Sequence, residues 1–382
     1  MKKLILFSGL LSLLFGCNSA DKSASKSELQ LNITDTIKTL PLPIGVGHFN
    51  HAFQSVEDQY LLFFDYKSFQ VLIYSKADGS LIKTIQLEQE GPNGIGKFVA
   101  GFFAKSLDEI YLTAGTNTLF KIDGNGKILQ KIQMDTGDLE KDGVSLFSNI
   151  FTIANDGIYF AAFPLVFEWT SLSPEELTKI PNLLKFDSLA GSFTPVSYFP
   201  EEFVGNNLNK AIFPILSLGP DQEPVINLNF RNLYQVKNGE VQAHSAAHSE
   251  FPEEPTTSSM SNMFEDMNEI MKMINNVDIY TDLFYLPEQE LLVRVAKFED
   301  IPESTADATF LASQWGLVFL DTDYKKVGEI TLEPNQYNGQ YIFGTNEGIW
   351  ISTDHPENPV LVGTWDGEYM HDIEVYNNKI YG

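Results

Sequence analysis

Short apolar runs, broken by glycine, asparagine and aspartate, repeat along most of this chain. The stretch FQVLIYSKADGSLIKTIQL, residues 69–87, reads as two alternating strands around the turn Asp78-Gly79. Asp-Gly between two such strands is a strong hairpin signal. A second copy, TLFKIDGNGKILQKIQM at residues 118–134, turns at Asn125-Gly126. Gly126 follows Gly79 after about 47 residues, a spacing typical of a four-stranded propeller blade.

Four weaker copies follow, with turns near Gly191, at Asn238-Gly239, near Tyr324 and at Asp366-Gly367. A further apolar run precedes most hairpins and opens on a polar residue; these runs begin at Asp108, Asp156, Glu223, Glu290 and Glu347. Six hairpins with leading strands predict an all-β fold, a single β-propeller of six blades, with seven as the alternative count. The alternating segment 29–43 has no hairpin of its own, and we expect it to join the last blade.

The glycine-rich stretch EGPNGIGKF, residues 90–98, raises the question of phosphate binding. The known phosphate fingerprints place their glycines between a strand and a helix. Here the chain continues as KFVAGFFAKSLDEIYL, which has no helical period and no P-loop Lys-Ser/Thr pair. We therefore interpret residues 91–96 as a connector between two blades.

The first 16 residues have the layout of a signal peptide. Two lysines precede an apolar run, residues 4–15, that is too short to span a bilayer as a mature helix. The run ends in LFGC, which resembles a bacterial lipobox, and lipidation of Cys17 would anchor the mature chain. An ordinary signal peptide that happens to end near a cysteine is the alternative. Since the chain has one cysteine, a disulfide within the monomer is excluded.

Residues 17–28 are small and polar, and they read as a flexible tether. This leaves residues 29–382 for the propeller domain. Asn18, and not an aspartate, follows the cysteine, which favours attachment to the outer membrane. The sequence does not decide whether the domain faces the periplasm or the outside.

The hairpins, the connector EGPNGIGKF and the lipobox together resemble known families. They resemble the NHL and TolB-like six-bladed propellers and, more closely, the function-unassigned propeller lipoproteins of Gram-negative bacteria. The resemblance extends from about Leu29 to Gly382. It implies a fold and a location in the cell envelope, and it offers no catalytic residues to transfer.

The chain is strongly acidic, with a formal net charge of −26 over 382 residues. Acidic residues are spread along the sequence, which is typical of a solvated surface. Such a surface repels phosphate backbones and argues against a nucleic-acid partner. We expect a monomer attached to a membrane by its lipid.

One segment has a helical pattern. Within residues 258–277, methionine, isoleucine and valine recur every three or four positions, which predicts one amphipathic helix. We expect it to pack against the face or rim of the propeller. In the alternative, Met263 and Met267 would let the helix bind varied apolar ligands as a lid. A copper site is disfavoured because no cysteine or histidine lies near these methionines.

Few residues suggest chemistry. His48 and His51 lie ahead of the first expected inner strand and His371 lies near the last blade, so we regard them as candidates for ligand binding. His244 and His248 have helical metal spacing, but they follow a strand and lack the glutamate of a zinc protease, so we interpret them as surface-loop residues. No Gly-x-Ser-x-Gly nucleophile motif occurs.

Propeller enzymes of the lactonase type hold calcium with Glu, Asn and Asp side chains at the starts of inner strands. That resemblance makes Asn50, Asn149, Asp278, Asp282 and Asp372 candidate metal ligands, since hard cations need several converging oxygens. Asp and Asn are also ordinary loop residues. We expect no cofactor and no catalytic residue, with a calcium site as the alternative.

These observations predict an exported, lipid-anchored protein that binds a peptide, a glycan or an envelope protein through one propeller face, without catalysis. Two alternatives remain open. One is a lactonase-like, metal-dependent hydrolase with a divalent ion on the axis. The other is an accessory subunit of an outer-membrane transporter.

Overall fold

The computed structural model divides the chain into two units, Met1–Ile33 and Thr34–Gly382, and the fold is that of the second. The structure describes residues 40, 43, 53–57, 59–115, 117–164, 173–200, 214–228, 231–251, 278–298, 314–334, 337–345, 348–352, 374–376 and 379–381. The predicted helix near 258–277 lies outside the described residues.

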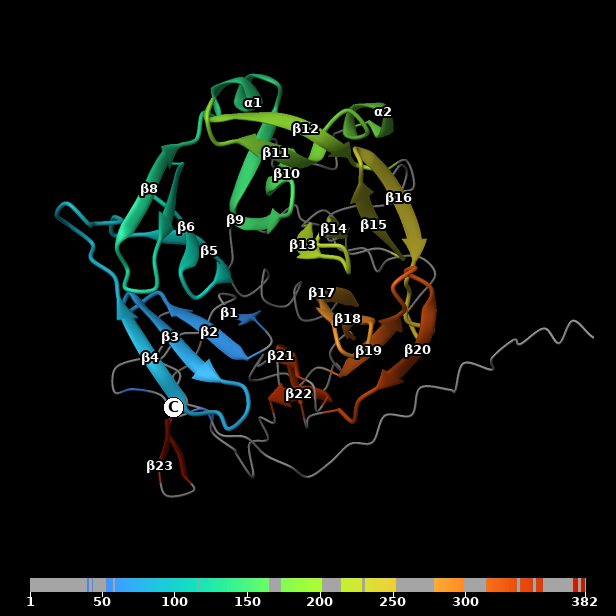
Figure 1. The fold of residues 1–382 in the computed structure, drawn as a ribbon. Coiled ribbons are helices and arrows are strands. Elements are labelled where there is room, and N and C mark those ends of the chain that lie inside the picture. Colours follow the sequence, from blue (N-terminus) through green and yellow to red (C-terminus); the bar gives the residue numbers. More distant parts are fainter. Residues whose placement is uncertain are drawn as a thin grey trace, which may run out of the picture. The chain divides into compact units, whose positions relative to one another are not determined.

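Five antiparallel four-stranded sheets follow one another along the chain, each with its strands in sequence order (Figure 1). The first sheet contains β1 (Phe53–Val56), β2 (Tyr60–Asp65), β3 (Gln70–Ser75) and β4 (Leu81–Gln86). The second contains β5 (Val99–Ser106), β6 (Glu109–Ala114), β7 (Thr118–Ile122) and β8 (Ile128–Gln133). The third contains β9 (Val144–Ala154), β10 (Gly157–Pro164), β11 (Pro181–Asp187) and β12 (Ser192–Tyr198).

The fourth sheet contains β13 (Ile215–Leu218), β14 (Pro224–Asn227), β15 (Asn232–Lys237) and β16 (Glu240–Ser245). The fifth contains β17 (Ile279–Leu286), β18 (Leu291–Lys297), β19 (Trp315–Leu320) and β20 (Lys326–Thr331). Two pairs complete the described strands: β21 (Asn338–Thr345) with β22 (Gly348–Ser352), and β23 (Glu374–Tyr376) with β24 (Lys379–Tyr381). Two short helices, α1 (Gly137–Lys141) and α2 (Pro174–Leu177), were not predicted.

The first strands of the sheets form a closed series. β1 contacts β5, β5 contacts β9, β9 contacts β13, β13 contacts β17 and β17 contacts β21. β21 also contacts β1, so β21–β22 takes the sixth position. The fold is an all-β propeller, as predicted, and its described strands support six blades. We call the first, second, third and fourth strand of each blade inner, second, third and outer.

The hydrophobic core lies between successive blades. The second and third strands are continuous apolar runs, as in Leu61–Phe64 of β2, because both faces of each blade are covered by neighbours. One cluster joins blades 1 and 2 through Phe64, Val71 and Leu112, and others lie between the following pairs. Leu40, from the segment expected to join the last blade, packs with Leu61 and with Phe343 of β21.

Five of the six predicted hairpins are confirmed as the turns between third and outer strands, and the sixth, at residues 366–367, lies outside the described residues. The five leading runs are confirmed as β6, β10, β14, β18 and β22. Gly79 and Gly126 have φ of 73° and 79°, a left-handed conformation that glycine adopts without strain. The turn glycines therefore serve the backbone, as the repeats indicated.

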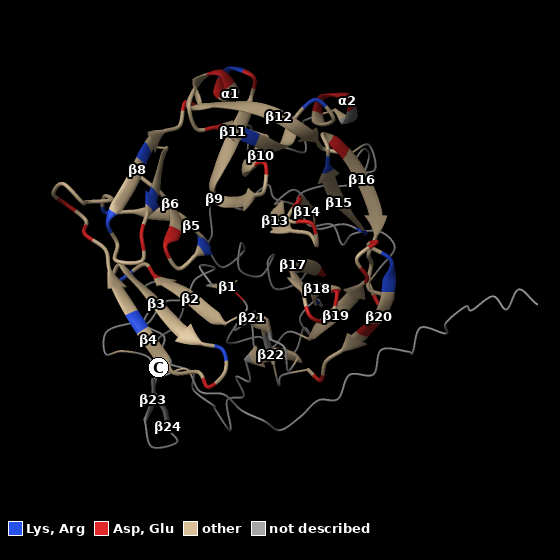
Figure 2. Ribbon diagram, viewed as in Figure 1, with Lys and Arg blue, Asp and Glu red and all other residues tan. Residues whose placement is uncertain are grey.

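The outer strands are polar and carry the charged residues at the rim, as Figure 2 shows for β4, β8, β16 and β20. Four of the five described outer strands also contain an extra, unpaired residue; these bulges are at Ile82, Leu129, Val196 and Val327. Bulges and lysines on an edge strand oppose pairing with another chain. The fifth outer strand, β16, is regularly paired over its whole length.

Candidate functional site

The two ends of the blades differ in the length of their connections. Inner strands run into second strands, and third into outer strands, through turns of two to five residues; we call this the turn end. At the opposite end, which we call the connection end, the longest connections between strands of the five four-stranded blades begin and finish; they are residues 165–180, 199–214, 246–278 and 298–314. Binding residues in propellers and other scaffolds concentrate on such connections, because they vary without disturbing the core.

Four of the six inner strands are bulged on the side that pairs with the second strand. The extra residues are Ala100 and Lys105 in β5, Ser148–Ile150 in β9, Thr281 in β17 and residues 339–341 in β21. A bulge bends the strand and redirects its side chains, and bulges are common next to functional sites. The pairing between inner and second strands is thus irregular in four blades, although a regular ladder would be enough to build a blade.

Polar side chains link neighbouring inner strands. The amide of Gln54 in β1 both donates to and accepts from the backbone of Ala104 in β5, at 2.8 and 2.6 Å. Ser217 Oγ donates to the carbonyl of Leu283 at 2.6 Å. A Cβ atom on Gly101 would lie 2.7 Å from the carbonyl oxygen of Ser148, so the close approach of β5 to β9 requires glycine. These contacts fix the relative positions of the bulged strands.

The structure places two of the predicted metal ligands at the inner-strand bulges. Asn149 lies within the bulge of β9 and is exposed, and Asp282 directly follows the bulge of β17. Both lie inside their strands and not at the starts. Loss of solvation raises the pKa of the Asp282 carboxyl to about 6, although the N–H of Leu283 donates to its Oδ1 at 2.7 Å and acts in the opposite direction.

Among the described residues, no group of three or more His, Cys, Asp or Glu side chains could hold a metal ion. Asp278 is described, just before β17. The other candidates lie outside the described residues: Cys17, His48, Asn50, His51, Met263, Met267, His371 and Asp372.

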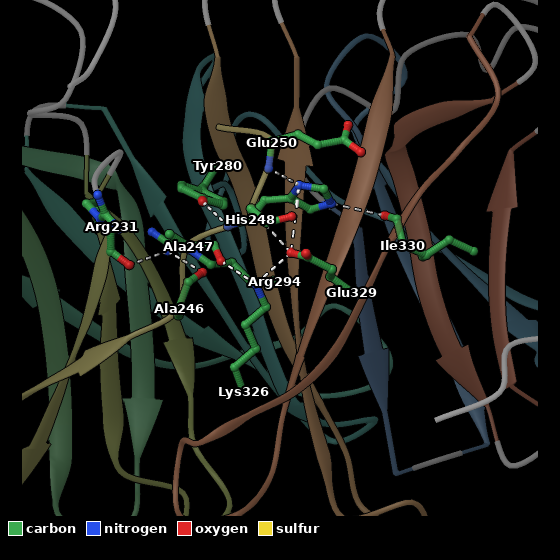
Figure 3. Close-up of polar contacts among 11 residues, drawn as sticks. Arg231, Ala246, Ala247, His248, Glu250, Tyr280, Arg294, Lys326, Glu329 and Ile330 are labelled. Atoms are coloured by element: carbon green, nitrogen blue, oxygen red, sulfur yellow. Dashed lines mark hydrogen bonds and ion pairs between the residues drawn. The ribbon is translucent and has the colours of Figure 1, made fainter. Parts of the chain in front are cut away.

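A buried arginine joins blades 4 and 5 close to the connection end (Figure 3). Arg294 in β18 is fully buried, and its guanidinium carbon lies 3.3 Å from the centre of the Tyr280 ring. Its nitrogens donate to Asn227 Oδ1 at 2.9 Å and to three carbonyls of blade 4, those of Leu228, Arg231 and Ala246. Burial lowers the pKa of Arg294 to about 10, so the side chain remains charged at neutral pH.

Asn227 extends this contact to the inner strand. Its Nδ2 donates to the carbonyl of Asp282 at 3.3 Å, while its Oδ1 accepts from Arg294. The backbone of the bulged β17 is therefore held by a chain of hydrogen bonds that begins at a buried guanidinium. A planar group with five donors suits this position better than a lysine would.

The chain leaving β16 is fixed against blade 5 by His248, whose side chain is 2% exposed (Figure 3). Its backbone N–H donates to Tyr280 Oη at 2.8 Å, and its Nδ1 accepts the N–H of Glu250 at 3.3 Å. Nε2 lies 3.4 Å from the carbonyl of Ile330. Because Nδ1 accepts, the proton of the neutral ring is placed on Nε2.

The prediction that His244 and His248 are surface-loop residues is wrong. His244 lies in β16, where its ring stacks on Tyr324 at 4.5 Å, and burial lowers its pKa. His248 packs edge-on against Phe298 of blade 5. Aromatic partners from blade 5 account for the burial of His248 and the partial burial of His244, and these partners were not visible in the local spacing.

The interpretation of residues 91–96 as a blade connector is confirmed, since they lie between the outer strand β4 and the inner strand β5. Asn93 Nδ2 donates to the carbonyl of Gly126 at 3.2 Å, and its Oδ1 accepts the N–H of Ile128 at 2.9 Å. The connector is thus attached to the next outer hairpin. The polar side chain of Asn93 therefore has a structural role, which is to hold the connector on that hairpin.

Sequence reasoning missed Arg294, Tyr280 and Asn227. The signal was an arginine inside the apolar run LLVRVAK of β18, because a charge in a doubly covered strand must find partners. The partners themselves come from β14, β17 and the chain after β16, and no local pattern connects those segments.

Fold and site together define a class: a closed β-propeller with bulged inner strands, tight turns at one end and long connections at the other. The chain belongs to the DUF4221 family, described as a domain of unknown function, whose profile matches residues 25–331. No match was found among curated proteins. Within the described residues, no helix is long and apolar enough to cross a bilayer.

Among solved structures that resemble this chain, another DUF4221 member shows the same fold. A DUF4221 member from Bacteroides vulgatus aligns with 86% of this chain and 93% of its own, at 17% identity and a TM-score of 0.69. A Bacteroides fragilis protein described as exported aligns with 85% of this chain and 83% of its own, at 13% identity and a TM-score of 0.48. Virginiamycin B lyase of Staphylococcus aureus aligns with 82% and 79%, at 11% identity and a TM-score of 0.43.

Proposed function

We propose that this protein is an exported, lipid-anchored binding module that engages a peptide, a glycan or a neighbouring envelope protein with the connection end of its propeller. The observation that carries the proposal is the difference between the two ends of the blades. The longest connections between strands of the five four-stranded blades begin and finish at one end, next to inner strands that are bulged and linked by hydrogen bonds. A rigid scaffold under variable connections is the usual design of a binding face.

An exposed aromatic side chain supports this choice of end. Phe98 directly precedes the inner strand β5 and is 65% exposed. Phenylalanine contributes strongly to binding when it enters a partner's pocket, and it is costly to leave in water. The carbonyl of Phe98 accepts the N–H of Gly115, so the backbone beneath the side chain is fixed.

The membrane anchor rests on the sequence. Lipidation of Cys17 followed by the polar tether, residues 17–28, would leave the propeller free to approach partners near the membrane. The Gram-negative propeller lipoproteins that the sequence resembles combine the same elements. We place the protein at the outer membrane because Asn18, and not an aspartate, follows Cys17.

The test is photocrosslinking in intact cells. Benzoylphenylalanine at Phe98 replaces one aromatic side chain by another at the connection end; the matched control is the same group at Leu189, which is 97% exposed at the turn end. We expect one reproducible adduct from position 98 and none from position 189. Adducts from position 189 alone, or the same adducts from both positions, would refute the choice of face.

Metal analysis separates binding from the hydrolase alternative. The purified chain, with and without prior treatment with a chelator, should contain no stoichiometric divalent ion. If the chain instead holds one ion tightly, and chelation removes both the ion and a hydrolytic activity, the binding-module proposal is refuted in favour of a metal-dependent enzyme.

A further inference from the structure

The outer edge of β16 differs from the other outer edges. Its pairing with β15 is regular from Lys237–Glu240 to Asn232–Ser245, while the other four described outer strands are interrupted by a bulge. β12 also contains Pro195, and β4, β8 and β20 carry lysines. β16, with the sequence EVQAHS, has no bulge, no proline and no lysine. A regular edge without these features is a template for a further strand.

The backbone groups that face outward follow from the turn. Asn238 and Gly239 have φ of 55° and 79°, as in a two-residue type I′ turn. Such a turn makes Lys237–Glu240 a hydrogen-bonded pair, so every second residue of β16 bonds to β15. The bond from Ala246 N to the carbonyl of Arg231, 3.0 Å, continues this alternation.

Val241, Ala243 and Ser245 therefore direct their N–H and C=O groups away from the blade. All three residues are exposed. Within the described part of the chain, no strand pairs with this edge of β16. The edge thus offers three donors and three acceptors in a regular row.

We propose that β16 pairs antiparallel with β16 of a second copy of the chain about a twofold axis, with Ala243 opposite the partner's Ala243. In this register Val241 lies opposite the partner's Ser245, and the outward groups form about six hydrogen bonds. Glu240 lies opposite the partner's Ala246 and Gln242 opposite the partner's His244, so no acid faces an acid. The proposal goes beyond ligand binding, because it uses the rim and leaves the connection end free.

The net charge of the chain determines the solution conditions under which this dimer should form. Two chains of net charge −26 repel one another, so a monomer is expected in dilute solution at low salt. A strand pair is also smaller than a standard stable interface. We therefore expect a weak dimer that strengthens with added salt, which screens the repulsion, and with confinement on a membrane, which raises the local concentration.

The register is tested by disulfide trapping in the full chain carrying Cys17→Ser, so that the introduced thiol is alone. Paired Cα atoms across a hydrogen-bonded position lie about 5.5 Å apart, within the range of a disulfide. At high salt with a mild oxidant, Ala243→Cys should form a covalent dimer at least about tenfold faster than Gln242→Cys. Equal rates, no dimer, or faster trapping at position 242 would overturn the proposal.

Sedimentation velocity gives an independent measurement. Ala243→Pro removes an outward N–H that β15 does not use, so the blade keeps its ladder. It should weaken the salt-dependent dimer at least about tenfold while leaving the melting temperature unchanged. Gln242→Ala is the control and should dimerise like wild type. Unaltered dimerisation of a folded Ala243→Pro chain would also overturn the proposal.

Discussion

At Glu329, a carboxylate of the outer strand β20 collects donors from its own strand and from the chain after β16. Partial burial alone would raise its pKa, but Lys326 Nζ at 2.6 Å and the N–H of Ser249 at 2.8 Å outweigh it and lower the pKa to about 2. The unfolded value is higher, so this carboxylate stabilises the fold above about pH 4.5 and the stabilisation is lost as the pH falls towards 2.

Glu329→Gln should therefore lower the free energy of unfolding by roughly 1 to 3 kcal/mol at pH 7, and by little once the pH falls below about 2. Urea denaturation across this pH range measures the difference. Asp323→Asn is the control, because the Lys325–Asp323 pair is about three-quarters exposed and such pairs contribute little. A constant deficit for Glu329→Gln at every pH would show that packing, and not charge, accounts for the loss.

For Asp282 we expect the opposite dependence of stability on pH. Its pKa is raised from 3.8 to about 6 by burial, so the folded chain favours the protonated form. The stabilisation is complete below about pH 4 and is lost as the pH rises through 6. Asp282→Asn, which keeps an oxygen for the Leu283 N–H, should melt at a higher temperature than wild type at pH 7 and at the same temperature near pH 3.5. A melting temperature below that of wild type at pH 7 would mean that the ionised carboxylate makes a stabilising interaction that asparagine cannot make.

At the scale of single elements, two glycines in the outer hairpins allow the cost of backbone strain to be measured apart from the cost of a steric clash. Gly126 and Gly239 both have φ of 79°, but a Cβ on Gly126 would lie 2.9 Å from Ile85 Cγ2, whereas a Cβ on Gly239 would meet nothing within 4 Å. The two positions form a matched pair in different blades.

Gly239→Ala should cost about 1 to 2 kcal/mol, the penalty for a left-handed alanine. Gly126→Ala should cost about 1 to 3 kcal/mol more, because the methyl group must displace the preceding blade. Thermal unfolding of the two variants under one set of conditions provides the comparison. Equal losses would show that the contact between the hairpin β7–β8 and β4 yields without cost.

The elements were predictable from local patterns, and the candidate site only in part. Asp-Gly and Asn-Gly turns located the outer hairpins because the turn geometry is fixed by two residues. The bulges at Asn149 and directly before Asp282 were not predicted, although both residues were chosen as candidates, because a bulge depends on how two strands pair. Arg294 and Asn227 meet across blades, and such a contact leaves no trace in the spacing of either strand.

At the scale of the whole molecule, the anchor is the most direct prediction. Replacing Cys17 by serine removes the thiol to which lipid would be attached, and the tether has no large apolar side chain that could hold the chain on a membrane instead. The wild-type chain should fractionate with membranes, and the Cys17→Ser chain should be released into the soluble fraction. Asn18→Ser is the control and should remain bound. Unchanged fractionation of the Cys17→Ser chain would contradict lipid anchoring.

The contact between β1 and β21 also has a consequence for how the chain folds. These strands come from opposite ends of the propeller sequence, yet they are neighbours in the closed series. Closing so long a loop costs entropy before the contact repays it, and proteins with such distant contacts fold slowly. The blades can assemble one after another along the chain, but the first and last seams must wait for β21. Until then a newly synthesised chain exposes the apolar surfaces of two unpaired blades, which is the period when it is most vulnerable to aggregation and proteolysis.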